Sequence, residues 1–221
     1  MIDIKGLTKT YTRSQQRVDA LKDVTLSIEA GGFVTVTGPS GSGKTTLLLS
    51  LGGLIQPSEG TVSYRNENLY DLSNSQLAKF RNRSIGFVLQ TFNLVPYLTA
   101  VENVMLPMLP RGGNGMAPKQ RALDLLKMIG LSDRSDFLPR ELSVGQQQRV
   151  AIARALGNEP EVILADEPTG NLDPALADEI LDILQDLNRN HGKTVVMVTH
   201  SPQAAARATR ILKLRDGMLI S

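Results

Sequence analysis

The residues with the strongest chemical signal form a glycine-rich turn in the first quarter of the chain. Backbone amides between glycines can approach phosphate oxygens closely, a lysine at the end of the turn reaches the β- and γ-phosphates, and the next hydroxyl holds Mg²⁺. A strand-like run precedes the turn and an apolar helical run follows it. The turn therefore predicts binding of ATP or GTP, with a plain strand-to-helix turn as the alternative. The nucleotide-binding residues it predicts are Gly38, Pro39, Ser40, Gly41, Ser42, Gly43, Lys44, Thr45 and Thr46, with Thr45 also on the metal.

Two adjacent carboxylates, Asp166 and Glu167, directly follow the apolar run 162–165. Carboxylates that leave a buried strand are costly unless they meet a cation or water. We expect Asp166 to bind the magnesium ion from its outer coordination sphere, and Glu167 to act as the general base that positions the attacking water. The alternative is that one of them only caps the turn at Pro168.

A third candidate site begins at Ser143, in the segment 142–150 that reads Leu-Ser-Val-Gly-Gln-Gln-Gln-Arg-Val. Ser143 can cap a helix while Gln146, three residues later, completes a capping box. The remaining free amides at this helix start would face an anion. A capped helix without a ligand is the alternative.

The elements around these residues predict an α/β fold. Residues 2–36 alternate apolar and polar positions, which predicts several strands, and three uniformly apolar runs at 85–89, 162–165 and 195–199 fit strands of a buried parallel sheet. Helical patterns cover 122–129, 150–156 and 176–187, and Asp173 and Pro174 suit the start of the last helix. Residues 91–156 carry no strand pattern and predict a helical lobe beside the core, with a loop at 112–115.

Composition limits the function classes. With 221 residues, one domain covering 1–221 is expected. The 24 basic and 22 acidic residues are mixed along the chain, so no nucleic-acid partner is expected. Cysteine is absent, which excludes disulfides and thiolate metal sites. The start lacks the layout of a signal peptide, and the most apolar stretch, 92–109, is too interrupted to span a bilayer, so we expect a cytoplasmic protein.

Taken together, these motifs resemble the ATP-binding subunits of ABC transporters over the whole chain. The segment from Ser143 resembles the ABC signature, usually Leu-Ser-Gly-Gly-Gln, and the resemblance implies that Ser143, Gly145 and Gln146 contact the ATP held by an opposite subunit. It also implies a P-loop NTPase core of the RecA-like kind, with an N-terminal antiparallel β subdomain and a helical lobe. ATP and Mg²⁺ are the implied cofactors.

The resemblance gives roles to four further positions. Gln90 resembles the Q-loop glutamine, which contacts magnesium and water, and His200 resembles the switch histidine at the γ-phosphate. Asp173 resembles the D-loop aspartate at the dimer interface. Tyr11 resembles the aromatic residue that stacks on adenine, with simple packing in a β-rich start as the alternative. His191, in a predicted turn, is interpreted as a solvated surface residue.

Several segments, among them 92–96, 98–104 and 167–173, look like the branch that contains lipoprotein-releasing, macrolide-export and cell-division ATPases. The implied partners are a second copy of the chain and an integral membrane permease, with the chain peripheral on the cytoplasmic face of the membrane. Coupling is expected through 90–97 and the helical lobe, where Phe92, Leu94 and Tyr97 are either exposed or part of the lobe's core. Val144 and Ser201 depart from the family pattern.

Two other functions stay open from the sequence. A soluble ABC ATPase of translation or DNA maintenance usually has two cassettes or a long coiled coil, and neither is present here. A mechanical regulator of the cell-division kind would use ATP without transporting a substrate.

Overall fold

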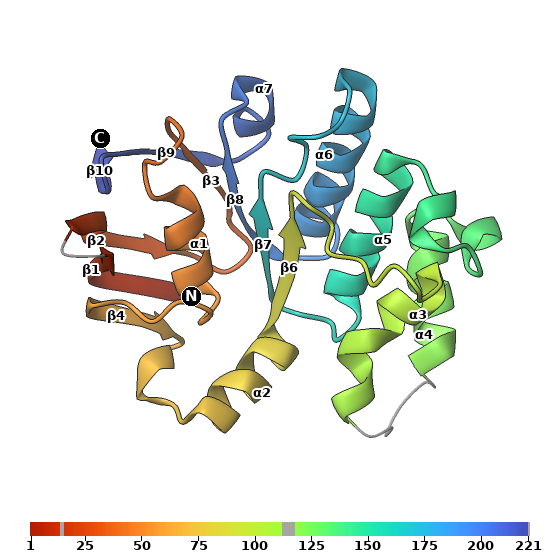
Figure 1. Cartoon of the computed structure of the whole chain (residues 1–221), viewed down its shortest axis with the longest axis horizontal. Helices are drawn as coiled ribbons and strands as arrows, with labels where there is room; N and C mark the ends of the chain where they lie inside the picture. The colour runs from red at the N-terminus through yellow and green to blue at the C-terminus, as the bar shows by residue number, and fades with distance from the viewer. Residues whose placement is uncertain (14–15, 112–117, 221) are drawn as a thin grey trace.

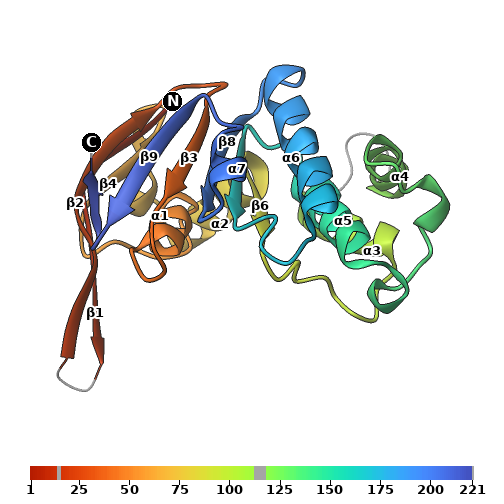
Figure 2. The same cartoon turned by 90° about the horizontal axis from the view of Figure 1, so that it is seen from above.

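The computed structural model describes residues 1–13, 16–111 and 118–220. The loop predicted at 112–115 lies outside the described residues. The described chain contains a four-stranded antiparallel sheet, a six-stranded sheet that is parallel except at one edge, and helices around the second sheet (Figures 1 and 2). The predicted fold class is confirmed.

The antiparallel sheet is built from the N-terminal part of the chain in the order β2-β1-β4-β5. Alternation of apolar and polar residues predicted the first two strands, and one face of them is buried. The second pair of strands was not predicted. The bounds are β1 Ile2–Arg13, β2 Gln16–Ile28, β4 Glu59–Tyr64 and β5 Glu67–Asn68.

The larger sheet has the strand order β10-β9-β3-β8-β7-β6. All three uniformly apolar runs are confirmed as neighbouring parallel strands. Both faces of these strands are covered, which explains why their sequences are apolar without alternation. Because the strands are parallel, their carboxyl ends share one edge of the sheet. The bounds are β3 Phe33–Thr37, β6 Ile85–Leu89, β7 Val162–Asp166, β8 Thr194–Thr199, β9 Arg210–Arg215 and β10 Met218–Ile220.

Helices cover both faces of this sheet. The α-helices are α1 Lys44–Leu51, α2 Asn74–Ser84, α3 Ala100–Met105, α4 Pro118–Met128, α5 Val144–Leu156, α6 Pro174–Arg189 and α7 Pro202–Ala205. Short 3₁₀ turns lie at η1 Leu69–Asp71, η2 Leu106–Arg111, η3 Ser132–Arg134 and η4 Pro139–Glu141. The strands are apolar on both faces, so α1 packs on one face and α5 and α6 on the other.

Alternate residues of β7 show how the sheet separates two cores. Val162 and Leu164 pack with α1 and the antiparallel sheet, whereas Ile163 and Ala165 pack with α5 and α6. The helices α3, α4 and α5 lie together on the second side, away from α1, in both views (Figures 1 and 2). Among the described residues, no helix is long and apolar enough to cross a membrane.

Candidate functional site

The glycine turn joins β3 to α1 at the carboxyl edge of the sheet. Gly43 has φ 102°, and a Cβ there would overlap the backbone carbonyl of Ala20, so only glycine fits at this position. The first turn of α1 carries no acidic residue and no side-chain cap. Its amides are therefore free to bind an anion, and the helix dipole favours negative charge there.

Lys44 and Ser42 fit the phosphate groups of a nucleotide. The Lys44 ammonium is buried and donates to the backbone carbonyls of Gly38, at 2.8 Å, and Pro39, at 3.0 Å, so it lies across the inside of the turn. The Ser42 hydroxyl is buried and has no hydrogen-bond partner among the described residues. A cation and an unpaired donor inside one backbone cradle suit an anionic ligand.

Thr45 and Asp166 bring a hydroxyl and a carboxylate together. Thr45 Oγ1 donates to Asp166 Oδ1 at 3.1 Å, across from α1 to the end of β7. Burial raises the pKa of Asp166, and the neighbouring Glu167 charge acts in the same direction, while the Thr45 hydrogen bond and Lys44 lower it. A carboxylate whose burial disfavours its charge suits a divalent cation, and both oxygen ligands fit Mg²⁺.

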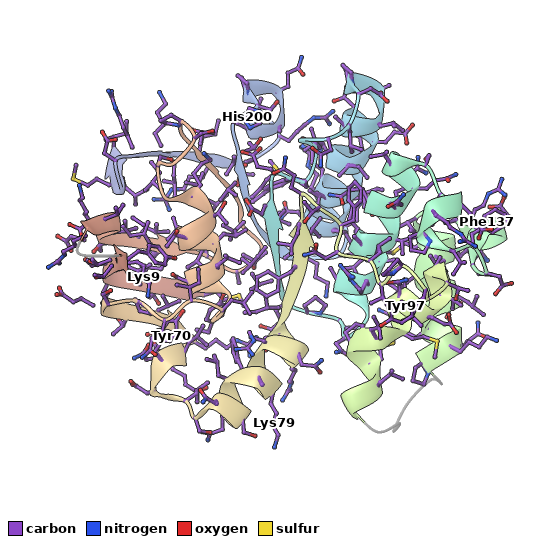
Figure 3. The ribbon with its side chains drawn as sticks, viewed as in Figure 1. Lys9, Tyr70, Lys79, Tyr97, Phe137 and His200 are labelled. Atoms are coloured by element: carbon purple, nitrogen blue, oxygen red, sulfur yellow. The ribbon has the colours of Figure 1, made fainter. Side chains whose placement is uncertain are left out.

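Glu167 and His200 form a second pair at the same edge. His200 Nδ1 lies 2.9 Å from Glu167 Oε1, and the His200 backbone amide donates to Glu167 Oε2 at 3.2 Å. The His200 side chain is 69% exposed beyond the end of β8 (Figure 3), whereas Glu167 is largely covered. Glu167 has φ 45°, an uncommon conformation for a residue with a Cβ. Its carboxylate is thus held at a fixed place facing solvent.

Gln90 directly follows β6 and is paired with Asn171, which belongs to the segment Asn171-Leu172-Asp173 that resembles the D-loop. Gln90 Nε2 donates to Asn171 Oδ1 at 3.4 Å, and Asn171 Nδ2 donates back to the Gln90 carbonyl at 3.1 Å. A Cβ on Gly170 would crowd Gln90 Nε2 at 2.9 Å. The resemblance placed Asn171 in the D-loop, but only the pairing of β6 with β7 reveals its contact with Gln90.

The signature-like segment starts α5 as predicted. Ser143 Oγ accepts a hydrogen bond from the backbone amide of Gln146 at 3.3 Å. Gln146 Oε1 accepts one from the backbone amide of Ser143 at 2.9 Å, which confirms the capping box. Val144 has no positive φ and is 45% exposed, as expected for a side chain pointing off the helix. The helix α5 covers the face of the sheet opposite to α1, and no hydrogen bond among the described residues joins Ser143 to the glycine turn.

Gly145 is buried for a reason that the sequence did not reveal. We expected glycine there only to admit an opposite ATP. The structure adds a contact within the chain, since a Cβ on Gly145 would meet the Leu176 side chain at 3.0 Å. The close packing of α5 on α6 therefore also requires a small residue.

The remaining predicted residues lie further apart. Tyr11 is an exposed residue of the hairpin that β1 and β2 form (Figure 2), with Lys9 Nζ 5.2 Å from its ring centroid. Asp173 Oδ1 caps α6 by accepting from the amides of Ala175 and Leu176, both at 3.1 Å, so its capping role is confirmed. Ser201 caps α7, accepting from the Ala204 amide at 3.3 Å, a role that the usual aspartate would fill equally.

A groove of about 490 Å³ lies between the core and the helical lobe. Residues lining the groove include Leu54, Ala78, Arg81, Phe87, Leu89, Leu106, Pro107 and Arg154.

The segment predicted for coupling does not line this groove. Within it, Tyr97 is 79% exposed (Figure 3), whereas Phe92 is half-buried and Leu94 packs partly against the lobe's core. Exposure therefore describes Tyr97, whereas Leu94 is closer to the alternative of packing in the lobe's core.

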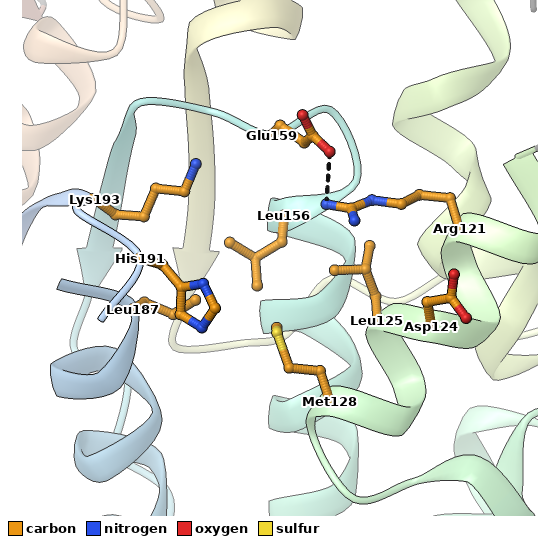
Figure 4. A pocket seen from close by; sticks show the side chains of 9 residues that line it. All are labelled: Arg121, Asp124, Leu125, Met128, Leu156, Glu159, Leu187, His191 and Lys193. Carbon is orange, nitrogen blue, oxygen red and sulfur yellow. Dashed lines mark ion pairs between the residues drawn. The ribbon is translucent and has the colours of Figure 1, made fainter. Parts of the chain in front are cut away.

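A smaller cavity of about 150 Å³ lies at the amino ends of β7 and β8, opposite the glycine turn (Figure 4). Arg121 crosses it toward Glu159 and pairs with it at 3.2 Å. His191 is half-exposed at its edge and pairs with Asp186 at 3.4 Å, which agrees with its interpretation as a solvated residue. None of the predicted site residues lines this cavity.

Fold and site together define a P-loop ATPase. Residues 21–170 match the family model described as ABC transporter. The chain belongs to this family and carries its ATP-binding, ATP-hydrolysing cassette.

Three relatives show how far the similarity extends. An uncharacterized ABC transporter ATP-binding protein, MJ0796 of Methanocaldococcus jannaschii, is 50% identical over 98% of this chain and 94% of its own. Lipoprotein-releasing system ATP-binding protein LolD 1 of Caulobacter vibrioides is 46% identical over all of this chain and 95% of its own. Macrolide export ATP-binding/permease protein MacB of Syntrophobacter fumaroxidans is 46% identical over 99% of this chain, which spans 31% of that relative.

The structure is similar to a solved one with the same architecture. A dimeric structure of a post-hydrolysis state of the MJ0796 ATP-binding cassette, bound to ADP and phosphate, matches with a TM-score of 0.93 at 46% identity. The match covers the whole of this chain and 97% of the solved chain.

Proposed function

We propose that the chain drives an exporter or extractor, in which two copies close on two ATP molecules and act on a separate membrane permease. One observation carries the proposal: β3, β8 and β7 are neighbours, and their carboxyl ends place Lys44, Thr45, Asp166, Glu167 and His200 at one edge of the sheet. This set contains a phosphate-binding cation, a metal-binding pair and a positioned base.

Each residue of the set has a distinct role in hydrolysis. Lys44 exchanges its backbone carbonyls for phosphate oxygens, while Thr45, Asp166 and Gln90 would hold Mg²⁺, with Asp166 in its outer coordination sphere. The metal would supply charge neutralisation on the phosphates. Glu167 takes a proton from the attacking water, and His200 keeps the Glu167 carboxylate aimed. Tyr11 stacks on the base of the nucleotide.

A second copy completes the site. The helices α1 and α5 cover opposite faces of one sheet, and Ser143, Gly145 and Gln146 are proposed to bind the ATP of the partner copy in a two-fold arrangement. The dimeric state of the similar cassette bound to ADP and phosphate supports this proposal. Asp173 lies beside that interface. Without nucleotide we expect a monomer.

The groove between core and lobe suits a segment of the permease. Its lining combines apolar side chains with Arg81 and Arg154, and it includes Leu89, the residue before Gln90, so an occupant is proposed to bias nucleotide closure through Gln90. The name of the MacB relative couples an ATP-binding protein with a permease in one chain. We propose that this chain binds its permease as a separate subunit, on the cytoplasmic face of the membrane.

Glu167→Gln tests the site and the dimer together. The amide cannot take the proton, so turnover is expected to fall by on the order of 10²-fold or more while ATP still binds. Light scattering should then show a dimer that accumulates with ATP and Mg²⁺ and is absent without them. Lys44→Ala is the matched control and is expected to lose ATP binding and the dimer. Wild-type turnover in Glu167→Gln would move the base to another residue.

A further inference from the structure

Gln148 is a buried amide on α5 that reaches the segment holding the general base. Its side chain is fully buried, and Nε2 donates to the Pro168 carbonyl at 2.6 Å. A carbonyl only accepts, so this contact fixes the orientation of the amide. Gln148 Oε1 is left buried without a hydrogen-bond partner among the described residues. An apolar residue at this position would avoid the cost of the unpaired oxygen. The hydrogen bond to Pro168 is therefore the property of Gln148 that an apolar residue would lack.

The Pro168 carbonyl belongs to the turn that sets the position of Glu167. On one side the Glu167 amide donates to the Val198 carbonyl of β8 at 2.9 Å, and the Gly170 amide donates back to the Glu167 carbonyl at 3.0 Å. Glu167 itself has φ 45°, which persists only where the surroundings hold it. Pro168 has no N–H, so its carbonyl is the group by which a side chain from α5 can hold it.

The helix α5 carries both Ser143, which is proposed to bind the partner's ATP, and Gln148, which contacts Pro168. Ser143 caps the start of α5 and Gln148 lies five residues later, about 7.5 Å along the axis at 1.5 Å per residue. A shift of the helix start on a partner's ATP is therefore transmitted directly to the Pro168 carbonyl.

We propose that Gln148 is a positioning residue that fixes Glu167 relative to α5, so that the base is aimed when the helix start is seated on the opposite ATP. This inference rests on the proposed role of Glu167. It assigns Gln148 no contact with the nucleotide, and its effect is expected in turnover rather than in binding.

Gln148→Met tests the proposal, since methionine fills a similar volume without the donor. In the nucleotide-driven dimer we expect kcat to fall at least about tenfold, the scale of a misplaced catalytic group, with KM for ATP within about twofold. Hydrogen exchange should rise at the amides of Glu167 and Gly170. The matched control is Gln185→Met. Gln185 Nε2 on α6 donates to the Arg207 carbonyl at 3.0 Å, also a long-range glutamine-to-carbonyl bond, and its Oε1 accepts from the Arg207 guanidinium at 2.8 Å. Neither bond involves the segment that holds Glu167. Gln185→Met should leave kcat unchanged.

A double variant separates this role from a structural one. If Gln148 acts through Glu167, Gln148→Met should reduce the residual turnover of Glu167→Gln by less than about twofold. An equal loss in both backgrounds, an equal loss in Gln185→Met, or an unchanged kcat would each overturn the proposal. Glu167→Gln alone tests the base assignment, so the two failures are distinguishable. Should Gln148→Met fail to fold, Gln148→Asn, which is one methylene too short to reach Pro168, is compared in its place.

Discussion

At the scale of single residues, the buried carboxylate of Asp166 is expected to lower the stability of the folded protein when no metal ion is bound. Burial raises its pKa, so the ionised carboxylate is less favourable in the folded than in the unfolded chain. That destabilisation is present above the folded pKa and disappears as pH falls through it. The cation that the site is proposed to bind would offset it.

Asp166→Asn is therefore expected to raise the Tm of the nucleotide-free protein, by a few degrees at most because the group is partly solvated, and to abolish Mg²⁺-dependent hydrolysis. The gain in Tm should shrink as pH is lowered through the raised pKa of Asp166. Thermal unfolding of both proteins across a pH series measures this. A variant less stable than the wild type at neutral pH would show that the Thr45 hydrogen bond outweighs burial.

The neighbouring positions 144 and 145 differ in the side-chain size that they accept, since Val144 is exposed and Gly145 is buried. Val144 is exposed and in ordinary helical geometry, so Val144→Gly should change turnover by less than roughly tenfold, about 1.4 kcal/mol of barrier. Gly145→Val should disable turnover, since a Cβ there is expected to obstruct the opposite ATP. The new side chain would also meet Leu176, at a cost of about 1–3 kcal/mol in overpacking. Steady-state hydrolysis of the two variants compares them. A large gain in turnover from Val144→Gly would show that the native site is obstructed.

The sequence predicts some of these residues and not others for a physical reason. Lys44, Asp166 and Glu167 lie in patterns where backbone approach or charge after an apolar strand requires one residue type. Asn171 and Gln148 act through single hydrogen bonds to segments distant in sequence. Nothing in the residues around them indicates such partners, which exist only once β6 pairs with β7 and α5 packs on the sheet.

At the scale of elements, a capping box made of serine and glutamine starts two helices for which different functions are proposed. Ser73 and Gln76 begin α2, as Ser143 and Gln146 begin α5. The stability of each helix start gains a similar amount, about 1 kcal/mol, from its cap. Only the second is proposed to meet a nucleotide.

Ser73→Ala and Ser143→Ala should therefore lower Tm by similar amounts, about 2–4 °C for a chain of this size. Hydrolysis is expected to be lost only in Ser143→Ala, because Ser143 is also proposed to bind the opposite ATP. Thermal unfolding and ATPase assays on both variants check this. Equal, small effects on turnover would reduce the start of α5 to a capped helix without a ligand.

Strands with a continuous apolar run were the easiest to predict, since β6, β7 and β8 each carry at least four consecutive residues without a charged side chain that pack inside the sheet. In contrast, α2 buries none of its side chains, so it has no apolar period to reveal it. The short strand β4 depends on pairing with β1, and β5 depends on pairing with β4, rather than on a pattern of their own. The groove could not be predicted, because α2, β6 and η2 form it only when folded.

At the scale of the whole molecule, the helix that follows the glycine turn and the helix that Ser143 starts cover opposite faces of the six-stranded sheet. Under the proposed arrangement, closure of two copies completes both sites. The groove between core and lobe includes Leu89, the residue before Gln90. A partner in the groove can therefore favour closure without touching ATP.

Leu54 offers a test of this coupling, because it lines the groove and is 50% exposed, so that a charge there should not disturb folding. In vesicles containing the permease, Leu54→Asp is expected to lose permease-stimulated hydrolysis, while the basal rate of the isolated chain stays within about twofold, since a surface change away from the site costs little. Ile211→Asp is the matched control: Ile211 is 49% exposed on β9, outside the groove, and its variant should keep both rates. Full stimulation of Leu54→Asp would exclude this groove as the docking surface, and a lost basal rate in Leu54→Asp alone would show instead that Leu54 supports α1 and the glycine turn.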